Sequence, residues 1–270
     1  MVEKSMGMLI DTSTCHGCKA CQVACKEWNG LPMEQEIGLT GISYDNTGHL
    51  SDTNWRHVKF VELFSEDRSD SRWLFLSDSC KHCQLAGCME VCPTNAIIRT
   101  EFDTVYIDQD TCIGCRYCIT GCPFGVIEIS HISGTAQKCT LCYDRLQVGQ
   151  QPACAQACPT DCIQFGEVPQ LMQLAEDREK LLKNMGYNKA QIYGKSDILN
   201  GLNVFYLLLE KPEVYGLPTN PQLPQKNMMK SYMFSIAGMV AAGVLALLAF
   251  RSKRMVSKPV DSDKDQSQVM

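Results

Sequence analysis

Sixteen of the seventeen cysteines in this 270-residue chain fall into four blocks with short, regular gaps. The first block is Cys15, Cys18, Cys21 and Cys25, the second is Cys80, Cys83, Cys88 and Cys92, the third is Cys112, Cys115, Cys118 and Cys122, and the fourth is Cys139, Cys142, Cys154 and Cys158. Such spacing is typical of iron-sulfur ligand loops, in which the last cysteine of a block ligates the neighbouring cluster. The sixteen cysteines therefore predict iron bound as four 4Fe-4S clusters.

Other uses of cysteine explain the pattern less well. A disulfide scaffold is normally a short secreted chain, and its cysteines are not spaced as repeated pairs two residues apart. Zinc needs only four thiolates and has no use for a triple repeat, so it could fit only the fourth block, where an eleven-residue gap precedes Cys154. Cys162 lies in an apolar stretch outside the blocks, and we expect a buried free thiol there.

Pairing the blocks predicts four ligand sets. The second and third blocks would form site III (Cys80, Cys83, Cys88, Cys122) and site IV (Cys92, Cys112, Cys115, Cys118). The outer blocks would form site I (Cys15, Cys18, Cys21, Cys158) and site II (Cys25, Cys139, Cys142, Cys154). A tandem pairing of the first block with the second is the alternative. The long segment between these two blocks favours the nested arrangement.

The remaining composition points to a folded redox protein without substrate chemistry of its own. The net charge is −5, with no long run of like charge, so nucleic acid is not an expected partner. We find no glycine-rich phosphate loop and no Ser-His-Asp order among the five histidines, so we expect no catalytic residue. His16 and His82 lie inside cysteine blocks, where a hydrogen bond to a cluster sulfur could tune its potential.

The expected fold class is α+β, with two ferredoxin-like double-cluster units, an inserted hairpin and one carboxy-terminal transmembrane helix. Residues 1–25 and 139–169 would form the outer unit and residues 80–138 the inner unit. We expect short strands near 96–98, 105–107 and 126–129, after the ligand loops. Residues 26–79 would be an insertion with a hairpin, from strands at 57–64 and 72–76. In the segment 170–230, we expect a helix over 170–185 and a proline-rich, non-helical connector over 211–226.

Residues 231–250 contain no charged residue. Roughly twenty apolar residues suffice to cross a bilayer as a helix, so we expect a single membrane span. More basic residues follow the span than precede it, which favours a cytoplasmic tail over 251–270 and an external cluster domain. The residues before Ile10 show no signal-peptide pattern. An external domain would then be exported folded on a partner that carries the signal.

The chain resembles the four-cluster electron-transfer subunits of molybdopterin oxidoreductases, and most of all the iron-sulfur subunits of membrane-bound formate dehydrogenases. The resemblance covers residues 9 to about 166 and is carried by the four blocks, including the opening segment Cys15–Asn29, the Cys80-Lys81-His82-Cys83 loop and the Lys138–Cys142 segment. The single carboxy-terminal span is shared with the formate dehydrogenase subunits. One departure is Lys26, where the other blocks have proline after their last cysteine.

The resemblance implies a subunit that takes electrons from a molybdenum or tungsten pterin subunit and passes them to a membrane cytochrome b that reduces quinone. The corresponding subunit of a polysulfide, tetrathionate or dimethyl sulfoxide reductase, with the opposite electron flow, is the alternative. A third hypothesis gives the clusters a purely structural role in a membrane-anchored docking module. The sequence does not separate the directions of electron flow, because cluster potentials depend on surroundings that spacing does not encode.

Overall fold

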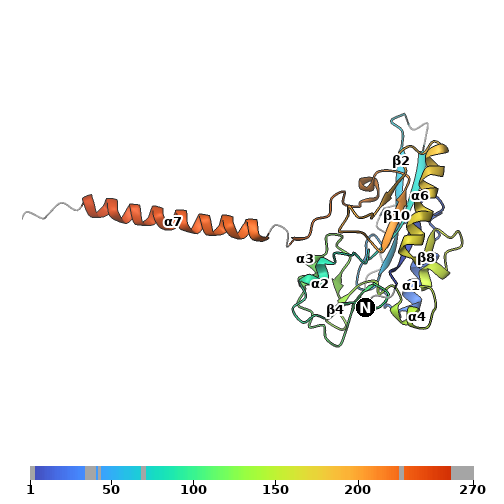
Figure 1. The fold of residues 1–270 in the computed structure, drawn as a ribbon, viewed down its shortest axis with the longest axis horizontal. Coiled ribbons are helices and arrows are strands. Elements are labelled where there is room, and N and C mark those ends of the chain that lie inside the picture. Colours follow the sequence, from blue (N-terminus) through green and yellow to red (C-terminus); the bar gives the residue numbers. More distant parts are fainter. Residues whose placement is uncertain (1–3, 34–40, 42–43, 68–70, 225–227, 257–270) are drawn as a thin grey trace, which may run out of the picture. The chain divides into compact units, whose positions relative to one another are not determined.

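The computed structural model describes residues 4–33, 41, 44–67, 71–224 and 228–256. Its largest sheet has four strands. They are β1 (Met6–Asp11), β8 (Ile163–Glu167), β9 (Gln191–Tyr193) and β10 (Val204–Leu208), in the spatial order β8-β1-β10-β9, and β8 and β10 are labelled in Figure 1. β1 pairs in parallel with β10 and antiparallel with β8. All five residues of β10 are buried, as expected of a central apolar strand. The sheet therefore joins the first strand of the chain to residues beyond the last cysteine block.

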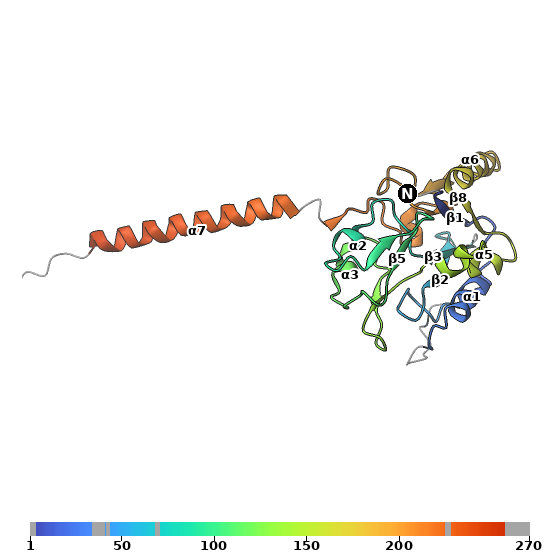
Figure 2. The ribbon, with the colours of Figure 1, turned by 60° about the horizontal axis from the view of Figure 1, so that its bottom comes forward.

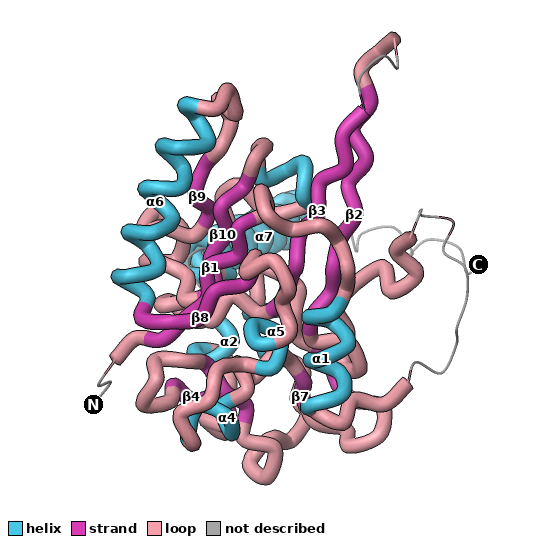
Figure 3. The backbone as a smooth tube through the Cα atoms, turned by 90° about the vertical axis from the view of Figure 1, so that its right-hand side faces the viewer, coloured by secondary structure: helices cyan, strands magenta, loops and turns pink. Residues whose placement is uncertain are grey.

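Helix α6 (Val168–Asn184) covers this sheet, with contacts to β1, β8 and β9 (Figure 3). Pro169 stands in its first turn, where the missing N–H costs nothing. Its buried residues Leu171, Ala175 and Leu182 follow helical spacing and face the core. The helix predicted over 170–185 is therefore present, two residues earlier than expected.

Strands β2 (Arg56–Phe64) and β3 (Ser71–Ser79) form the predicted hairpin, which is longer than expected at its base. Arg56 lies opposite Ser79 there. The rings of Phe60 and Phe75 pack edge to face and lie close to Gly17 in the first cysteine block. A Cβ atom on Gly17 would lie 2.8 Å from the Phe75 ring, so this approach requires glycine.

The segment between the second and fourth blocks contains only short elements. They are α2 (Gly87–Glu90), β4 (Ile97–Arg99), β5 (Val105–Ile107), α3 (Tyr117–Gly121), β6 (Glu128–Ile129) and β7 (Ala136–Gln137). β4 pairs with β5, and β6 pairs with β7. Figure 2 shows α2 and α3 on one side of the cysteine-bearing part of the chain, with α1 (Ala20–Trp28) and α5 (Ala153–Gln156) on the other. A fourth short helix, α4 (Tyr143–Gln147), precedes α5.

Two expectations for the segment 170–230 were wrong. Strands β9 and β10 lie where only helix and connector were expected, because β10 forms its hydrogen bonds with the distant β1. The connector also contains a 3-10 helix, η1 (Pro212–Tyr215). Pro212 supplies the helical φ that starts this turn, and Gly216, at a φ of 70°, ends it.

The chain divides into two compact units, Met1–Pro224 and Gln225–Met270. The second unit contains helix α7 (Met228–Val256). Its segment Ser231–Arg251 is long and apolar enough to cross a membrane, in agreement with the span predicted over 231–250. The helix continues to Val256, into the segment 251–270 that was expected to be a polar tail, and the rest of that tail lies outside the described residues.

Candidate functional site: four groups of cysteines

Each cysteine block turns at the residue before its second cysteine. This residue has a positive φ in all four blocks: 71° at Gly17, 45° at His82, 66° at Gly114 and 58° at Leu141. Such a φ is disfavoured for residues with a Cβ atom, so the loop imposes it on the histidine and the leucine. In the fourth block, the turn brings the Leu141 N–H to 3.4 Å from the Cys139 Sγ. Backbone N–H groups turned in this way favour an anionic sulfur.

The cysteines predicted for site II come together from distant parts of the chain. Burial raises the pKa of Cys25 well above its usual value, and the charges of the three fourth-block members of the site add to this effect. Burial likewise raises the pKa of Cys154 to about 12 and that of Cys142 to about 11. All four thiols are buried. The structure thus places Cys25 beside the fourth block rather than beside the second.

The cysteines predicted for sites III and IV each line a small cavity of their own. The cavity at site III contains all four of its cysteines together with His82 and Phe124. The cavity at site IV contains all four of its cysteines and the turn at Gly114. Burial raises the pKa of Cys88 to about 12 and that of Cys118 to about 11. Each cavity therefore presents four thiols and few other polar groups.

At site I, the structure brings together Cys15, Cys21 and Cys158. Burial raises the pKa of Cys21, and the charges of Cys15 and Cys158 act in the same direction. Cys18 lies on the same loop as Cys15 and is exposed. Three of the four predicted members are therefore in mutual electrostatic contact, and the fourth faces solvent.

Cys162 is 2 % exposed, as expected of a buried thiol, but its position had not been foreseen. It comes directly before β8, and its thiol is the main cause that lowers the pKa of both Cys15 and Cys158. The pKa of Cys158 falls to about 5. The only sequence signal for this contact is the four-residue step from Cys158.

Charge effects between the groups indicate that they form a series. Burial raises the pKa of Cys154 in site II, and the charge of Cys21 in site I adds to this effect. Burial raises the pKa of Cys139 in site II, and the charge of Cys80 in site III adds to this effect. Burial also raises the pKa of Cys88 in site III, and Cys118 in site IV adds to it. The groups therefore follow one another in the order I, II, III, IV.

The donors in these groups suit 4Fe-4S clusters. Among the described residues, no three or more His, Cys, Asp or Glu side chains are spaced as ligands of a single metal ion. A cubane cluster binds its four thiolates at separate iron corners and so needs them farther apart. His82, also in the cavity of site III, is fully buried. Its Nδ1 accepts the Val105 N–H at 3.0 Å, and its Nε2 has no hydrogen-bond partner in the part of the chain that the structure describes. His16 is exposed.

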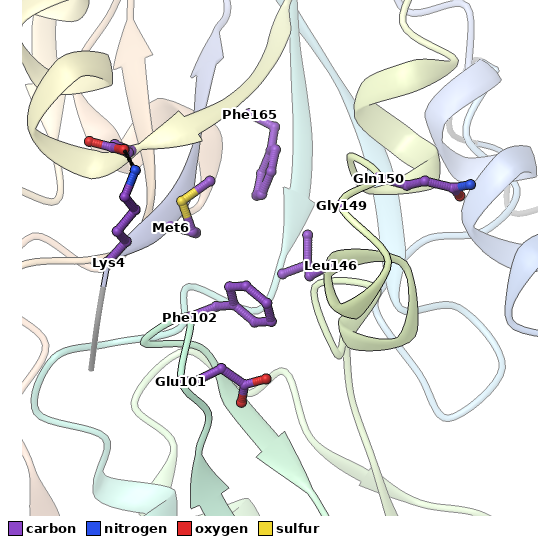
Figure 4. Close-up of a pocket in the computed structure, with 9 residues that line it drawn as sticks. Lys4, Met6, Glu101, Phe102, Leu146, Gly149, Gln150 and Phe165 are labelled. Atoms are coloured by element: carbon purple, nitrogen blue, oxygen red, sulfur yellow. Dashed lines mark hydrogen bonds and ion pairs between the residues drawn. The ribbon is translucent and has the colours of Figure 1, made fainter. Parts of the chain in front are cut away.

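A cavity of about 290 Å³ elsewhere on the molecule contains none of the sixteen cysteines. Figure 4 shows Phe102, Leu146 and Phe165 around it, and the ion pair of Lys4 with Glu167 lies at one side. It holds no group of thiols, so it is not a cluster site.

Comparison with known proteins agrees with the geometry. The 4Fe-4S dicluster domain family matches residues 71–168, and a second 4Fe-4S dicluster family matches residues 14–96. The chain therefore carries two dicluster domains and four 4Fe-4S clusters. The second match spans the first and second blocks, which are the pair in the tandem alternative, whereas the structure places Cys25 beside the fourth block.

Whole-chain relatives extend the likeness beyond the cysteines. The nitrate-inducible formate dehydrogenase iron-sulfur subunit of Escherichia coli is 39% identical over 265 residues, covering 95% of this chain and 88% of the relative. The formate dehydrogenase iron-sulfur subunit of Haemophilus influenzae is 40% identical, covering 94% and 82%. A subunit of the anaerobic dimethyl sulfoxide reductase of E. coli is 34% identical, but over only 61% of this chain and 75% of its own length. The four groups of cysteines and the near full-length formate dehydrogenase relatives show that this chain belongs to the family of formate dehydrogenase iron-sulfur subunits.

Proposed function

We propose that this chain transfers electrons within a membrane-bound formate dehydrogenase, from a molybdopterin subunit that oxidises formate to a membrane cytochrome b that reduces quinone. The observation that carries this proposal is the unbroken series of four groups of cysteines. In this series, the charge of a thiol in one group affects the pKa of a thiol in the next group. Bound 4Fe-4S clusters supply one-electron carriers, and the chain's part is to hold them close together.

The proposed ligands are the nested sets given above as sites I to IV. Mutual charge effects among the thiols support sites I and II, and shared cavities support sites III and IV. In this arrangement, residues 1–25 and 139–169 form an outer ferredoxin-like unit around an inner unit of residues 80–138. Residues 26–79, which contain the β2–β3 hairpin, are the insertion between them.

The two ends of the series are suited to exchange electrons with partner subunits. Of the sixteen cysteines in the sites, Cys18 in site I and Cys115 in site IV are exposed, whereas sites II and III have no exposed thiol. Short distances favour electron transfer, so an exposed ligand marks the place where a partner can approach. Electrons would therefore enter at one terminal site and leave at the other.

Helix α7 would anchor the subunit in the membrane. Arg251 and the basic residues that follow it outnumber those just before Ser231, which favours a cytoplasmic tail and an external cluster domain. Sidedness can be tested on intact cells with a protease that does not cross the membrane. Cleavage within Met1–Pro224 before lysis would support an external domain, and full protection would reverse the orientation.

The proposed electron source can be tested on the native membrane complex, purified without oxygen. We expect formate to produce the EPR signals of reduced 4Fe-4S clusters within the time of enzyme turnover. Clusters that stay oxidised with formate but are reduced by dithionite would favour a reductase of the dimethyl sulfoxide type, to one subunit of which this chain is also related. A complex without clusters would contradict electron transfer altogether.

A further inference from the structure

Arg56, at the start of β2, is a buried cation without an acidic partner. Its side chain is 1 % exposed, and no carboxylate of the described residues forms an ion pair with it. Its Nη1 donates to the Ser77 hydroxyl at 2.9 Å, and its Nη2 donates to the Ser79 hydroxyl at 3.2 Å and contacts the Met8 sulfur at 3.4 Å. Its Nε–H is buried and has no hydrogen-bond partner among the described residues. A charge buried in this way is costly unless an anion lies close by.

The anions near Arg56 are cysteine sulfurs from two different sites. Burial acts to lower the pKa of Arg56, but the charges of four thiols outweigh it and raise the pKa further above its usual value. These thiols are Cys154, Cys139 and Cys25 of site II and Cys21 of site I. The guanidinium group therefore lies at the junction between the two sites.

Hydrogen bonds link Arg56 directly to one of these sulfurs. The Ser77 hydroxyl, which accepts from Arg56, lies 3.3 Å from the Cys21 Sγ. Because the guanidinium group has only donors, the hydroxyl hydrogen remains free to point to the sulfur. Ser77 and Ser79 are both buried, so they hold the cation in one place.

We propose that Arg56 is the shared countercation of the clusters in sites I and II and raises the reduction potential of both. This inference rests on the ligand sets of the proposed function. A cluster with four thiolate ligands is anionic, and reduction adds an electron without a proton, so a fixed nearby cation stabilises the reduced form more than the oxidised form. Arginine keeps its charge throughout the physiological pH range. Sites III and IV are affected less, since Arg56 is not among the main influences on the pKa of Cys83, Cys88 or Cys118.

The test is a redox titration of the intact complex followed by EPR, with iron content measured on the same samples. In Arg56→Gln, we expect full iron content and more negative midpoint potentials for two clusters, each harder to reduce by on the order of tenfold. The other two potentials should not move. Arg56→Lys, which keeps the charge, should restore most of the shift.

Arg72→Gln is the matched control. Arg72 lies on β3 of the same hairpin, is 46 % exposed and pairs with Glu210 at 3.0 Å. Its loss therefore changes the net charge by the same amount but has a much smaller effect on the electrostatic potential at the thiols. We expect all four potentials to stay unchanged in this variant. Shifts as large as those of Arg56→Gln would overturn the proposal.

The remaining outcomes also decide the question. Unchanged potentials in Arg56→Gln at full iron content would overturn the role of Arg56 and leave the ligand sets intact. Cluster loss in Arg56→Gln but not in Arg56→Lys would show that the clusters require a positive charge at this position, in support of the proposal. Cluster loss in both variants would show that Arg56 acts by packing, and would overturn it. Cys18→Ala and Cys142→Ala identify the signals of sites I and II, so an error in the ligand sets would show in these variants instead.

Discussion

The ammonium group of Lys81 contacts the carboxylate of Asp78 where both side chains are buried, and the Tyr206 hydroxyl donates to the same carboxylate at 3.1 Å. Lys59 approaches this carboxylate from β2 at 2.9 Å. Asp78 therefore joins the hairpin, the second cysteine block and the central strand β10. Removing it would leave the Lys81 charge buried without a counterion.

We expect Asp78→Asn to destabilise the domain by about 3–5 kcal/mol, the usual cost of breaking a buried ion pair from one side. Urea unfolding, followed by loss of cluster absorbance, measures the change. Burial opposes the charged form, but Lys81 and Lys59 outweigh it and lower the pKa of Asp78 below its usual range. Its contribution is therefore complete at neutral pH and is lost only as the pH falls below about 4. Glu176→Gln, which breaks a partly exposed pair with Lys195, should change stability by about 1 kcal/mol or less.

The nested ligand sets make a specific prediction for Cys25. Because Cys25 lies among the fourth-block thiols, Cys25→Ala should remove or alter the same EPR signal as Cys142→Ala. In the tandem arrangement, Cys25 would belong with the second block, and Cys25→Ala would affect the same signal as Cys83→Ala. EPR spectra of the three variants, reduced with dithionite, distinguish the two arrangements.

Cys162 is not expected to be an iron ligand, although it lies beside site I. Its thiol lowers the pKa of Cys15 and Cys158 but is not one of the sixteen proposed ligands, so Cys162→Ala should keep the full iron content. Iron analysis, with Cys158→Ala as the comparison, checks this outcome. Loss of a whole cluster in Cys162→Ala would assign it a ligand role.

Removal of iron should loosen the two parts of the domain unequally. The buried core around sites III and IV combines cysteines with alanine, valine and isoleucine side chains, and its strands have two or three residues each. The four-stranded sheet has a larger apolar core, including Phe205, Leu207 and Leu208. After chelation, we expect hydrogen exchange to rise first in residues 80–138 and later in β1 and β10. Uniform loss of protection would show that the domain unfolds as one unit.

The membrane helix should be dispensable for cluster binding. All seventeen cysteines lie within the unit Met1–Pro224, which has its own core. A chain that ends at Pro224 is therefore expected to leave the membrane fraction when produced without its partners, with its iron content unchanged. Fractionation and iron analysis test both parts. A truncated chain that lost its clusters would show that α7 supports the fold.

Local patterns in the sequence predicted the local elements well. The hairpin, helix α6 and the apolar segment of α7 each show a regular pattern within a short stretch, so their types and approximate bounds could be predicted. Strand β10 could not, because Val204–Leu208 is a short apolar run whose partner, β1, lies near the other end of the chain. No local pattern reports such a pairing.

The candidate site was predictable in its residues but not in its surroundings. Cysteine spacing gives the sixteen proposed ligands, since ligand loops are local. Arg56 gave no signal, because a single arginine beside a strand is ordinarily exposed, and only the fold buries it between two sites. The order of the sites likewise comes from contacts between remote blocks.

The position of β1 in the sheet constrains how the chain can mature during synthesis. β1 leaves the ribosome well before both of its neighbours, β8 and β10, which follow all four cysteine blocks. The amino-terminal strand must therefore wait, unpaired, until the cluster region has been translated. The sheet can close only after all four cysteine blocks have been translated, so cofactor insertion can precede its closure.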